Sequence, residues 1–425
     1  MLEFIIGRAG TGKTTHCLNS IKQKLHTNPQ GNPLIILVPD HMTFAIEREL
    51  ALQTKDIGGF SRAYVLGMSR LAYQVLMRCG GALHPHLSEI GKELLLSRVL
   101  SHTNLSILAK AARQHHFTAS VASIIEEFKT SGISTEMLRD ILKLIENETL
   151  KQKINDLTTI YTGLNEQMEG RYHDSEDILN LAIQRLPNCT WLQHAELWID
   201  GFDAFNPQHL LVIEQLLKLA DNVHLTLCIN NLTKMEHEPE TALFHRQYIV
   251  YEQLHQIAHK LTIPTKITTL TQNHRYHKAD LAFIEQQLFK FPLASKPYKG
   301  GLHIIEAANR RLECEAIAAD ILRLCREEHY RYQDIGILLR DNDSYGDLLQ
   351  AVLNDYKLPF FSDSKRQTAH HPLAELIRSS LEALRTWQYE PLFRAFKTDF
   401  FPALRGEIDL LENYVLSFGI RGFNR

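Results

Sequence analysis

The residues best suited to chemistry lie at the start of the chain, in the sequence Gly7-Arg-Ala-Gly-Thr-Gly12-Lys13-Thr14. Glycines let the backbone curl so that successive N–H groups face phosphate oxygens, and a helix that begins near Lys13 adds its positive end. In this pattern the lysine reaches the β and γ phosphates, and the hydroxyl of Thr14 binds Mg²⁺. A glycine-rich turn without a ligand is the alternative. The predicted nucleotide-binding residues are Gly7, Arg8, Ala9, Gly10, Thr11, Gly12, Lys13, Thr14 and Thr15.

A second chemical motif is the sequence Trp198-Ile-Asp200-Gly-Phe-Asp203. An acidic residue at the end of an apolar strand beside a P-loop strand can hold Mg²⁺ directly or through water. Asp200 is the candidate for that role. Strands that end in aspartate are common, so an ordinary strand end is the alternative, and the P-loop earlier in the chain favours the metal role.

These motifs require a parallel sheet to position them. Short apolar runs separated by helical periodicity indicate buried parallel strands and an α/β fold. The expected strands are 2–6, 33–38, 64–68, 196–200 and 223–229. Between them, residues 87–186 contain few prolines or glycines and repeat apolar residues at i, i+3 and i+4, which predicts an all-helical insertion.

The same patterns divide the chain. A second α/β unit is expected from the apolar runs 302–306, 335–339 and 359–361. The expected segments are a first lobe in two parts (1–85 and 188–232), a helical insertion (86–187), a linker region (233–300), the second lobe (301–386) and the start of a second insertion (387–425).

Composition narrows the protein class. Of 425 residues, 44% are hydrophobic and 22% are charged, with a formal net charge of -3. No secretory signal is evident, and no apolar run approaches the ~20 residues of a membrane span. The six cysteines include no C-x-x-C pair, so reduced thiols in the cytoplasm are expected. The near-neutral charge means that any DNA contact needs a local groove.

Several short sequence motifs occur in the order that is typical of a known protein family. After the P-loop come Val38-Pro-Asp-His-Met-Thr-Phe44, Ser69-Arg-Leu-Ala72, Trp198-Ile-Asp-Gly-Phe202 and Ala308-Asn-Arg-Arg311. Together they are similar to the AddB family, one of the two components of Bacillus-type AddAB helicase-nucleases. The resemblance covers the whole chain and implies a P-loop NTPase with a UvrD-like superfamily-one helicase core of RecA-like lobes. It further implies an N-terminal portion, with the nuclease domain, its metal and an iron-sulfur cluster only in a C-terminal part.

The chain departs from the working motors of that fold. Their strand ends in Asp-Glu, whereas Gly201 stands where the glutamate would activate water. Asp203 is the nearest acidic residue and is a weak substitute. General-base assistance is worth about 10²- to 10⁴-fold in rate. We therefore expect ATP and Mg²⁺ binding with little or no hydrolysis, and no confident catalytic residue. Arg340 matches an arginine that contacts the γ-phosphate, although a solvated arginine at a strand end is the alternative.

The resemblance also implies a biological role. AddB works with the subunit AddA as an ATP-dependent helicase-exonuclease on DNA ends, processes double-strand breaks for recombinational repair, and scans a single strand for the Chi sequence. Such scanning needs cations and aromatic platforms. A core role for Phe44 and a helix-face role for Tyr73 are the alternatives. The DNA-binding candidates are His41, Thr43, Phe44, Arg70, Tyr73, Phe205 and Gln208.

Two other functional classes are compatible with a P-loop. In a stand-alone P-loop kinase or phosphotransferase, Lys13, Thr14 and Asp200 would act on a small substrate. The second α/β unit has no place in that scheme. In a structural scaffold, the nucleotide site would be an evolutionary remnant. The intact Gly12-Lys13-Thr14 sequence argues against a loss of nucleotide binding.

Overall fold

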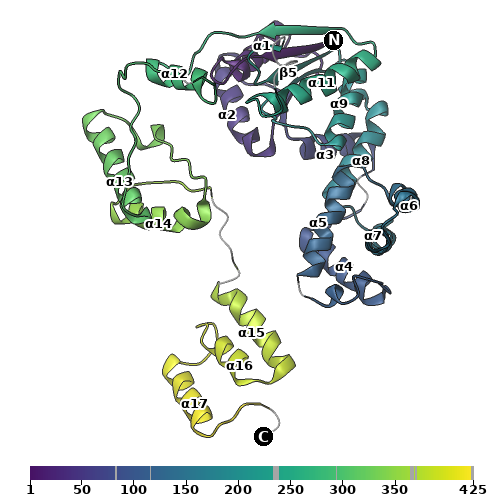
Figure 1. Cartoon of the computed structure of the whole chain (residues 1–425), viewed down its shortest axis with the longest axis vertical. Coiled ribbons are helices and arrows are strands. Elements are labelled where there is room, and N and C mark those ends of the chain that lie inside the picture. The colour runs from purple at the N-terminus through teal and green to yellow at the C-terminus, as the bar shows by residue number, and fades with distance from the viewer. Residues whose placement is uncertain are drawn as a thin grey trace. The chain divides into compact units, whose positions relative to one another are not determined.

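The computed structural model describes residues 1–81, 84–114, 116–232, 239–292, 294–363, 368 and 371–422, without the side chains of residues 175 and 176. The residues that are not described belong to five of the predicted segments, which therefore lie partly outside the described residues. These segments are 1–85, 86–187, 233–300, 301–386 and 387–425. The chain divides into two compact units, Met1–Leu302 and His303–Arg425, which are described separately (Figure 1).

Unit 1 is built on a six-stranded sheet in the order β3-β2-β4-β5-β1-β6. Every pairing is parallel; Phe4 of β1, for example, lies opposite Leu225 of β5 and Ile267 of β6. The strands are β1 (Leu2–Ile6), β2 (Leu34–Leu37), β3 (Ala63–Leu66), β4 (Glu196–Ile199), β5 (Asn222–Leu227) and β6 (Thr265–Thr269). The predicted α/β fold with a parallel sheet is therefore confirmed, and the carboxyl ends of all six strands lie at one edge.

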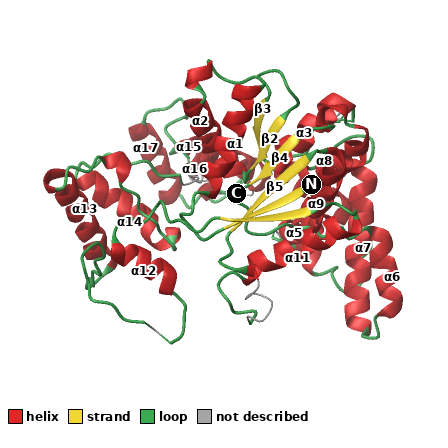
Figure 2. Ribbon diagram, turned by 90° about the horizontal axis from the view of Figure 1, so that it is seen from above, coloured by secondary structure: helices red, strands yellow, loops and turns green. Residues whose placement is uncertain are grey.

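Helices cover both faces of this sheet (Figure 2). On one face, α1 (Lys13–Thr27) and α2 (Thr43–Gln53) enclose a core around the fully buried Trp198. The other face packs against a larger apolar cluster from four helices. These are α3 (Met68–Cys79), α8 (Ser175–Arg185), α9 (Pro207–Leu219) and α11 (His245–Lys260). Apolar residues at helical spacing, such as Leu71, Val75 and Leu76 of α3, explain why these elements form.

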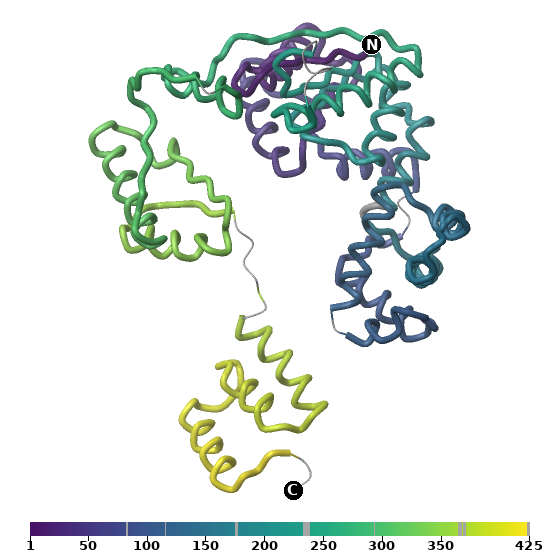
Figure 3. The backbone as a smooth tube through the Cα atoms, viewed as in Figure 1, coloured from purple at the N-terminus to yellow at the C-terminus, as the bar shows by residue number. Residues whose placement is uncertain are grey.

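A helical insertion separates β3 from β4 in the sequence. The chain leaves the sheet layer through α3 and returns through α8 (Figure 3). The insertion has its own apolar core, which includes Leu96, Ile125 and Leu164. Ser134 and Asn147 cap two of its helices through side-chain oxygens. Its helices are α4 (Glu89–His102), α5 (Phe117–Thr130), α6 (Thr135–Leu144) and α7 (Glu148–Met168).

The structure differs from the expected linker at 233–300. This region contributes α11, the sheet strand β6 and α12 (Ala279–Gln287) to unit 1. The strand escapes sequence reading because Thr265–Thr269 contains one aliphatic residue, Ile267, and is largely exposed at the sheet edge. Pairing with β1, not burial, holds it in place.

Unit 2 contains helices only among its described residues. They are α13 (Arg310–Glu327), α14 (Asn342–Asp355), α15 (Pro372–Thr386), α16 (Tyr389–Phe396) and α17 (Arg405–Ser417). The expected strands at 302–306, 335–339 and 359–361 are not formed, so that prediction is wrong for this structure. A strand requires a hydrogen-bonded neighbour, and these apolar segments have no ladder partner here.

Short 3-10 turns complete the described elements, and none of the helices in the described ranges is long and apolar enough to cross a membrane. The turns are η1 (Asp40–Met42), η2 (Lys55–Ile57), η3 (Ala111–Arg113), η4 (Leu186–Asn188), η5 (Thr190–Leu192) and η6 (Tyr332–Asp334).

A buried carboxylate ties β5, β1 and the edge strand β6 together near their amino ends. Glu3 of β1 contacts Nδ1 of His224 at 2.6 Å and Nζ of Lys266 at 2.7 Å, and accepts a hydrogen bond from Thr268. Burial raises the pKa of Glu3, but the bonds from Lys266, Thr268 and His224 outweigh it and hold the pKa at about 2. The ionised carboxylate is therefore the stabilising form.

We expect this carboxylate to make unit 1 sensitive to acid. Its contribution is complete above the pKa of an unfolded glutamate, 4.5, and is lost as the pH falls towards 2. The shift corresponds to about 3 kcal/mol of unfolding free energy. Urea unfolding at about pH 5 and pH 2.5 will show a smaller pH-dependent loss in Glu3→Gln than in the wild type. Glu148→Gln, at an exposed position, is the control. An equal pH-dependent loss of stability in Glu3→Gln and the wild type would contradict this account, as would a loss in Glu148→Gln as small as that in Glu3→Gln.

Candidate functional site

The P-loop lies at the carboxyl edge of the sheet, between β1 and α1. Gly10 and Gly12 have φ values of 84° and 81°, in the left-handed region that glycine adopts without strain. Gly12 caps the helix, and Lys13 is its first residue. The loop therefore presents backbone N–H groups beside a helix amino end, an arrangement suited to phosphate.

Lys13 folds back over this loop. Its Nζ donates hydrogen bonds to the carbonyl oxygens of Gly7 at 2.6 Å and Arg8 at 3.0 Å. Burial lowers the pKa of Lys13, and the nearby charge of Arg275 also lowers it. Cys228 and Asp200 act in the opposite direction and raise it. An anion bound near Lys13 and Arg275 would relieve the repulsion between these two cations.

The predicted metal residues meet directly. The Thr14 hydroxyl donates a hydrogen bond to Oδ2 of Asp200 at 2.7 Å, although the two residues are 186 positions apart. Thr226 of β5 donates to the other carboxylate oxygen. Asp200 is 2% exposed and follows β4 at the same sheet edge. A hydroxyl and a carboxylate are the hard oxygen ligands that Mg²⁺ takes beside nucleotide phosphates, so these residues fit the ion.

Gly201 is held in its conformation by the fold. Its φ is 79°, and a Cβ at this position would lie 2.9 Å from Sδ of Met42. A side chain at this position would therefore strain the backbone and displace the Met42 side chain, so glycine is the residue best suited to it.

We expect Gly201→Ala to destabilise unit 1 by about 1–3 kcal/mol, from the left-handed backbone and the contact with Met42. Gly58→Ala is the matched control, because Gly58 has a φ of 77° with nothing within 4 Å. It retains the backbone cost and omits the contact. Chemical denaturation measures both variants. If they unfold at the same urea concentration, Met42 does not restrict this position.

A segment that sequence reasoning missed lies against the P-loop. The N–H of His274 donates to the Gly10 carbonyl at 2.9 Å, and a Cβ on Gly10 would lie 2.8 Å from Cβ of Arg275. The segment follows β6, whose partner is β1, so strand pairing brings it to the loop. In the sequence, the basic run Asn273-His-Arg-Tyr276 is the feature that could have indicated this segment.

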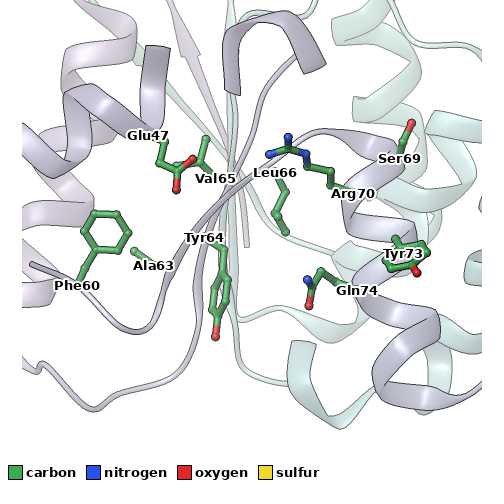
Figure 4. A pocket seen from close by; sticks show the side chains of 10 residues that line it. All are labelled: Glu47, Phe60, Ala63, Tyr64, Val65, Leu66, Ser69, Arg70, Tyr73 and Gln74. Atoms are coloured by element: carbon green, nitrogen blue, oxygen red, sulfur yellow. The ribbon is translucent and has the colours of Figure 1, made fainter. Parts of the chain in front are cut away.

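A pocket of about 510 Å³ lies along β3, one of the two outer strands of the sheet. Figure 4 shows Arg70 and Tyr73 of α3 on one side, Glu47 and Phe60 on the other, and Tyr64 of β3 between them. Tyr73 is 53% exposed. A guanidinium and aromatic rings around one open pocket can contact phosphate and stack on bases.

The other candidates on the loop after β2 have different surroundings. His41 is exposed, and the Phe44 ring is 76% exposed, which excludes the core role considered for it. Thr43 is buried, and its hydroxyl donates to the Asp40 carbonyl at 2.9 Å. His41 and Phe44 are therefore available to a ligand, whereas the Thr43 hydroxyl is already bonded.

Comparison with known proteins decides the family. The sequence model described as "ADDB, N-terminal" matches residues 4–285, which include both the P-loop and the pocket along β3. This chain belongs to the AddB family. The resemblance drawn from the motifs is therefore confirmed.

Curated AddB relatives align along almost the entire chain, and each is named as the B component of an ATP-dependent helicase/deoxyribonuclease. The relative from Desulforamulus reducens is 40% identical, that from Desulforudis audaxviator 39% and that from Bacillus anthracis 36%, each over 99% of this chain. The chain spans 37% of the length of each of these proteins.

Two of the DNA-binding candidates drawn from the AddB resemblance are buried. Phe205 is 9% exposed and packs on Phe202, with ring centroids 5.1 Å apart. Gln208 is 2% exposed, and its amide donates to Asn180 at 3.0 Å. Their side chains support α9 and offer no open surface to DNA, so we assign them to packing instead.

The remaining nucleotide candidates of the AddB pattern are placed as follows. Arg8 pairs with Glu285 of α12 at 2.7 Å and lies 5.0 Å from the Phe244 ring centroid. Thr11 donates to the Arg8 carbonyl at 2.9 Å, and Thr15 is exposed on α1. Arg340 is an exposed residue of unit 2. Its predicted contact with the γ-phosphate stays a prediction.

Proposed function

We propose that this chain is the nucleotide-binding and DNA-reading part of an AddB protein, with a P-loop NTPase core of the UvrD-like type. The observation that carries the proposal is the bond between Thr14 and Asp200 beside Lys13 and Arg275. Hydroxyl, carboxylate, cations and a helix amino end converge on one sheet edge. These are the groups that bind Mg²⁺ and a nucleoside triphosphate.

In this proposal the site binds ATP and hydrolyses it slowly or not at all. Mg²⁺ would neutralise phosphate charge when held at Thr14 and Asp200. Lys13 and Arg275 hold the phosphates, and Gly201 provides no group to accept a proton from water. The nearest other acid, Asp203, is exposed beyond the strand end. Bound nucleotide then stabilises the sheet edge and leaves translocation to a partner, the AddA subunit.

The nucleotide proposal is tested on the whole chain by calorimetric titration with ATP, with and without Mg²⁺, alongside phosphate release with and without single-stranded DNA. Saturable Mg²⁺-dependent binding with release near background is expected. Absence of binding would overturn the nucleotide site. Rapid DNA-stimulated release would overturn the inactive motor while leaving the site intact.

We further propose that single-stranded DNA runs along the pocket beside β3, where AddB reads Chi during the processing of double-strand breaks. Arg70 and Tyr73 support this, because both line the pocket with exposed side chains. His41 and Phe44 extend the surface on the neighbouring loop. In the complex with AddA, crosslinking to Chi-containing and scrambled strands distinguishes sequence reading from general DNA binding.

We expect Arg70→Ala to weaken single-stranded DNA binding about tenfold, because it removes a charged hydrogen-bond donor. The slope of log affinity against log salt will fall by about one. Tyr73→Ala will weaken binding without changing that slope, since stacking involves no counterion release. Fluorescence anisotropy with a labelled oligonucleotide measures both. Arg139→Ala, on the helical insertion, is the control. If Arg139→Ala weakens DNA binding as much as Arg70→Ala does, the proposal that DNA binds in this pocket is wrong.

A further inference from the structure

The arginine of the P-loop is held by a helix that lies far away in the sequence. The Arg8 Nε donates a hydrogen bond to Oε1 of Glu285 in α12 at 2.7 Å, and the Arg8 Nη2 donates to the backbone carbonyl of the same residue. The two side chains are 14% and 19% exposed. The guanidinium also lies 5.0 Å from the centroid of the Phe244 ring. An arginine that is paired through two nitrogens and stacked on a ring is fixed in one position.

The backbone of the same arginine organises the interior of the P-loop. The Arg8 carbonyl oxygen accepts hydrogen bonds from Nζ of Lys13 at 3.0 Å and from the Thr11 hydroxyl at 2.9 Å. The Thr11 N–H donates to this oxygen at 3.3 Å. We propose that Glu285 is a positioning residue of the nucleotide site, a role that rests on the function proposed above. Through Arg8 it holds the loop and Lys13 in the arrangement that receives phosphates.

The helix that carries Glu285 is itself anchored. Asp280, in the first turn of α12, is 7% exposed and accepts a hydrogen bond from the Lys299 N–H at 2.9 Å. The segment before α12 is fixed to the P-loop, because the His274 N–H donates to the Gly10 carbonyl at 2.9 Å. One stretch of chain therefore contacts the loop on both sides of Ala9. A residue that positions another must be held in place, and these contacts meet that requirement.

Charge and position predict opposite effects of this carboxylate on nucleotide affinity. A negative charge near the loop repels phosphate, so by Coulomb's law alone the removal of Glu285 would strengthen binding. A positioning role predicts weaker binding, because the partly buried guanidinium of Arg8 would lose its counterion and the loop would lose its preorganised shape. The sign of the change therefore distinguishes the two effects.

Calorimetric titration of the whole chain with Mg-ATP tests the role of the pair. Glu285→Ala and Arg8→Ala are each expected to weaken binding about tenfold. The double variant will bind no more weakly than the weaker single variant, because the two residues act as one unit. Glu285→Gln keeps an oxygen that accepts from the Arg8 Nε, so its affinity will lie closer to that of the wild type.

The control is Gln286→Ala, an exposed neighbour on α12, which will bind Mg-ATP as the wild type does. Unchanged or tighter binding by Glu285→Ala would overturn the positioning role. Additive losses in the double variant would also overturn it, since they would show that Arg8 contacts phosphate independently of Glu285.

A second measurement needs no nucleotide. Amide hydrogen exchange of residues 7–13 is compared in the wild type, Glu285→Ala and Gln286→Ala, with the Thr11 N–H as the reporter of the bond to the Arg8 carbonyl. Several-fold faster exchange is expected in Glu285→Ala alone. Equal exchange in all three chains would overturn the positioning role. Absence of Mg-ATP binding by the wild type would overturn the nucleotide function instead, and the exchange data would still decide whether Glu285 holds the loop.

Discussion

Lys13→Ala will reduce Mg-ATP affinity by about 100-fold or more, because it removes a cation that makes charge-assisted bonds to phosphate. The Lys13 Nζ already occupies the mouth of the loop, where it bonds to the Gly7 and Arg8 carbonyls. Alanine is a strong helix former, so α1 will retain its structure. Isothermal titration of the wild type and variant measures the loss.

The control for this substitution lies on the same helix. Lys22 of α1 pairs with Asp56 at 3.1 Å, and the two side chains are 32% and 52% exposed. A surface pair contributes about 0–1 kcal/mol, so Lys22→Ala will bind Mg-ATP as the wild type does. Equal affinity in Lys13→Ala and the wild type would show that the loop binds no phosphate at this position. Circular dichroism of both variants excludes unfolding as the cause.

Lys129→Met will destabilise the helical insertion by about 3–5 kcal/mol, since it leaves buried carboxylates without their cation. The Lys129 Nζ lies 2.7 Å from Asp174 and 2.8 Å from Asp177. Lys129 is 5% exposed and Asp174 is 1% exposed. Burial lowers the pKa of Lys129, but the charges of Asp174 and Asp177 outweigh it and raise the pKa. Urea unfolding followed by circular dichroism measures the effect.

An exposed pair in the same insertion provides the comparison. Lys143 and Asp140 lie 2.8 Å apart with side chains more than 70% exposed (74% and 73%). Lys143→Met is expected to change the unfolding free energy by about 0.5 kcal/mol or less. Asp174 also caps α8, so Asp174→Asn combined with Lys129→Met separates the ion pair from the cap. Equal stability of Lys129→Met and the wild type would show that another cation compensates the buried carboxylates. Lys92, whose Nζ lies 3.8 Å from Asp174, is the candidate for that role.

In the proposed function, nucleotide binding and hydrolysis would separate at one residue of this site. Lys13, Thr14 and Asp200 are positioned as a phosphate and Mg²⁺ site requires. Gly201 has a backbone conformation and a neighbour, Met42, that oppose the side chain a motor would need there. A glutamate at this position would strain the backbone and would have to displace the Met42 side chain.

Much of the first unit could be predicted from local patterns. Short, largely buried apolar runs predicted β1, β2, β3, β4 and β5, because parallel strands covered by helices on both faces are mostly apolar. The P-loop could be read in the same way, since its glycines, lysine and threonine are contiguous. Such features depend on residues that are neighbours in the sequence.

The features that were missed depend on distant partners. β6 is an exposed edge strand with no apolar pattern, and its pairing with β1 brings Arg275 to the P-loop. The burial of Phe205 and Gln208 follows from packing around α8 and α9. The apolar runs of unit 2 have strand-like composition but remain without ladder partners. Composition cannot specify which segments will meet.

By itself the sequence determined the family, the strands β1 to β5 and the position of the predicted P-loop, because each is encoded by contiguous residues. Only the tertiary structure decided that Thr14 bonds to Asp200 and that Arg275 lies beside Gly10 of the loop. These contacts form because parallel strands bring remote segments to one edge of the sheet. Chain topology, which local periodicity does not specify, sets those distances.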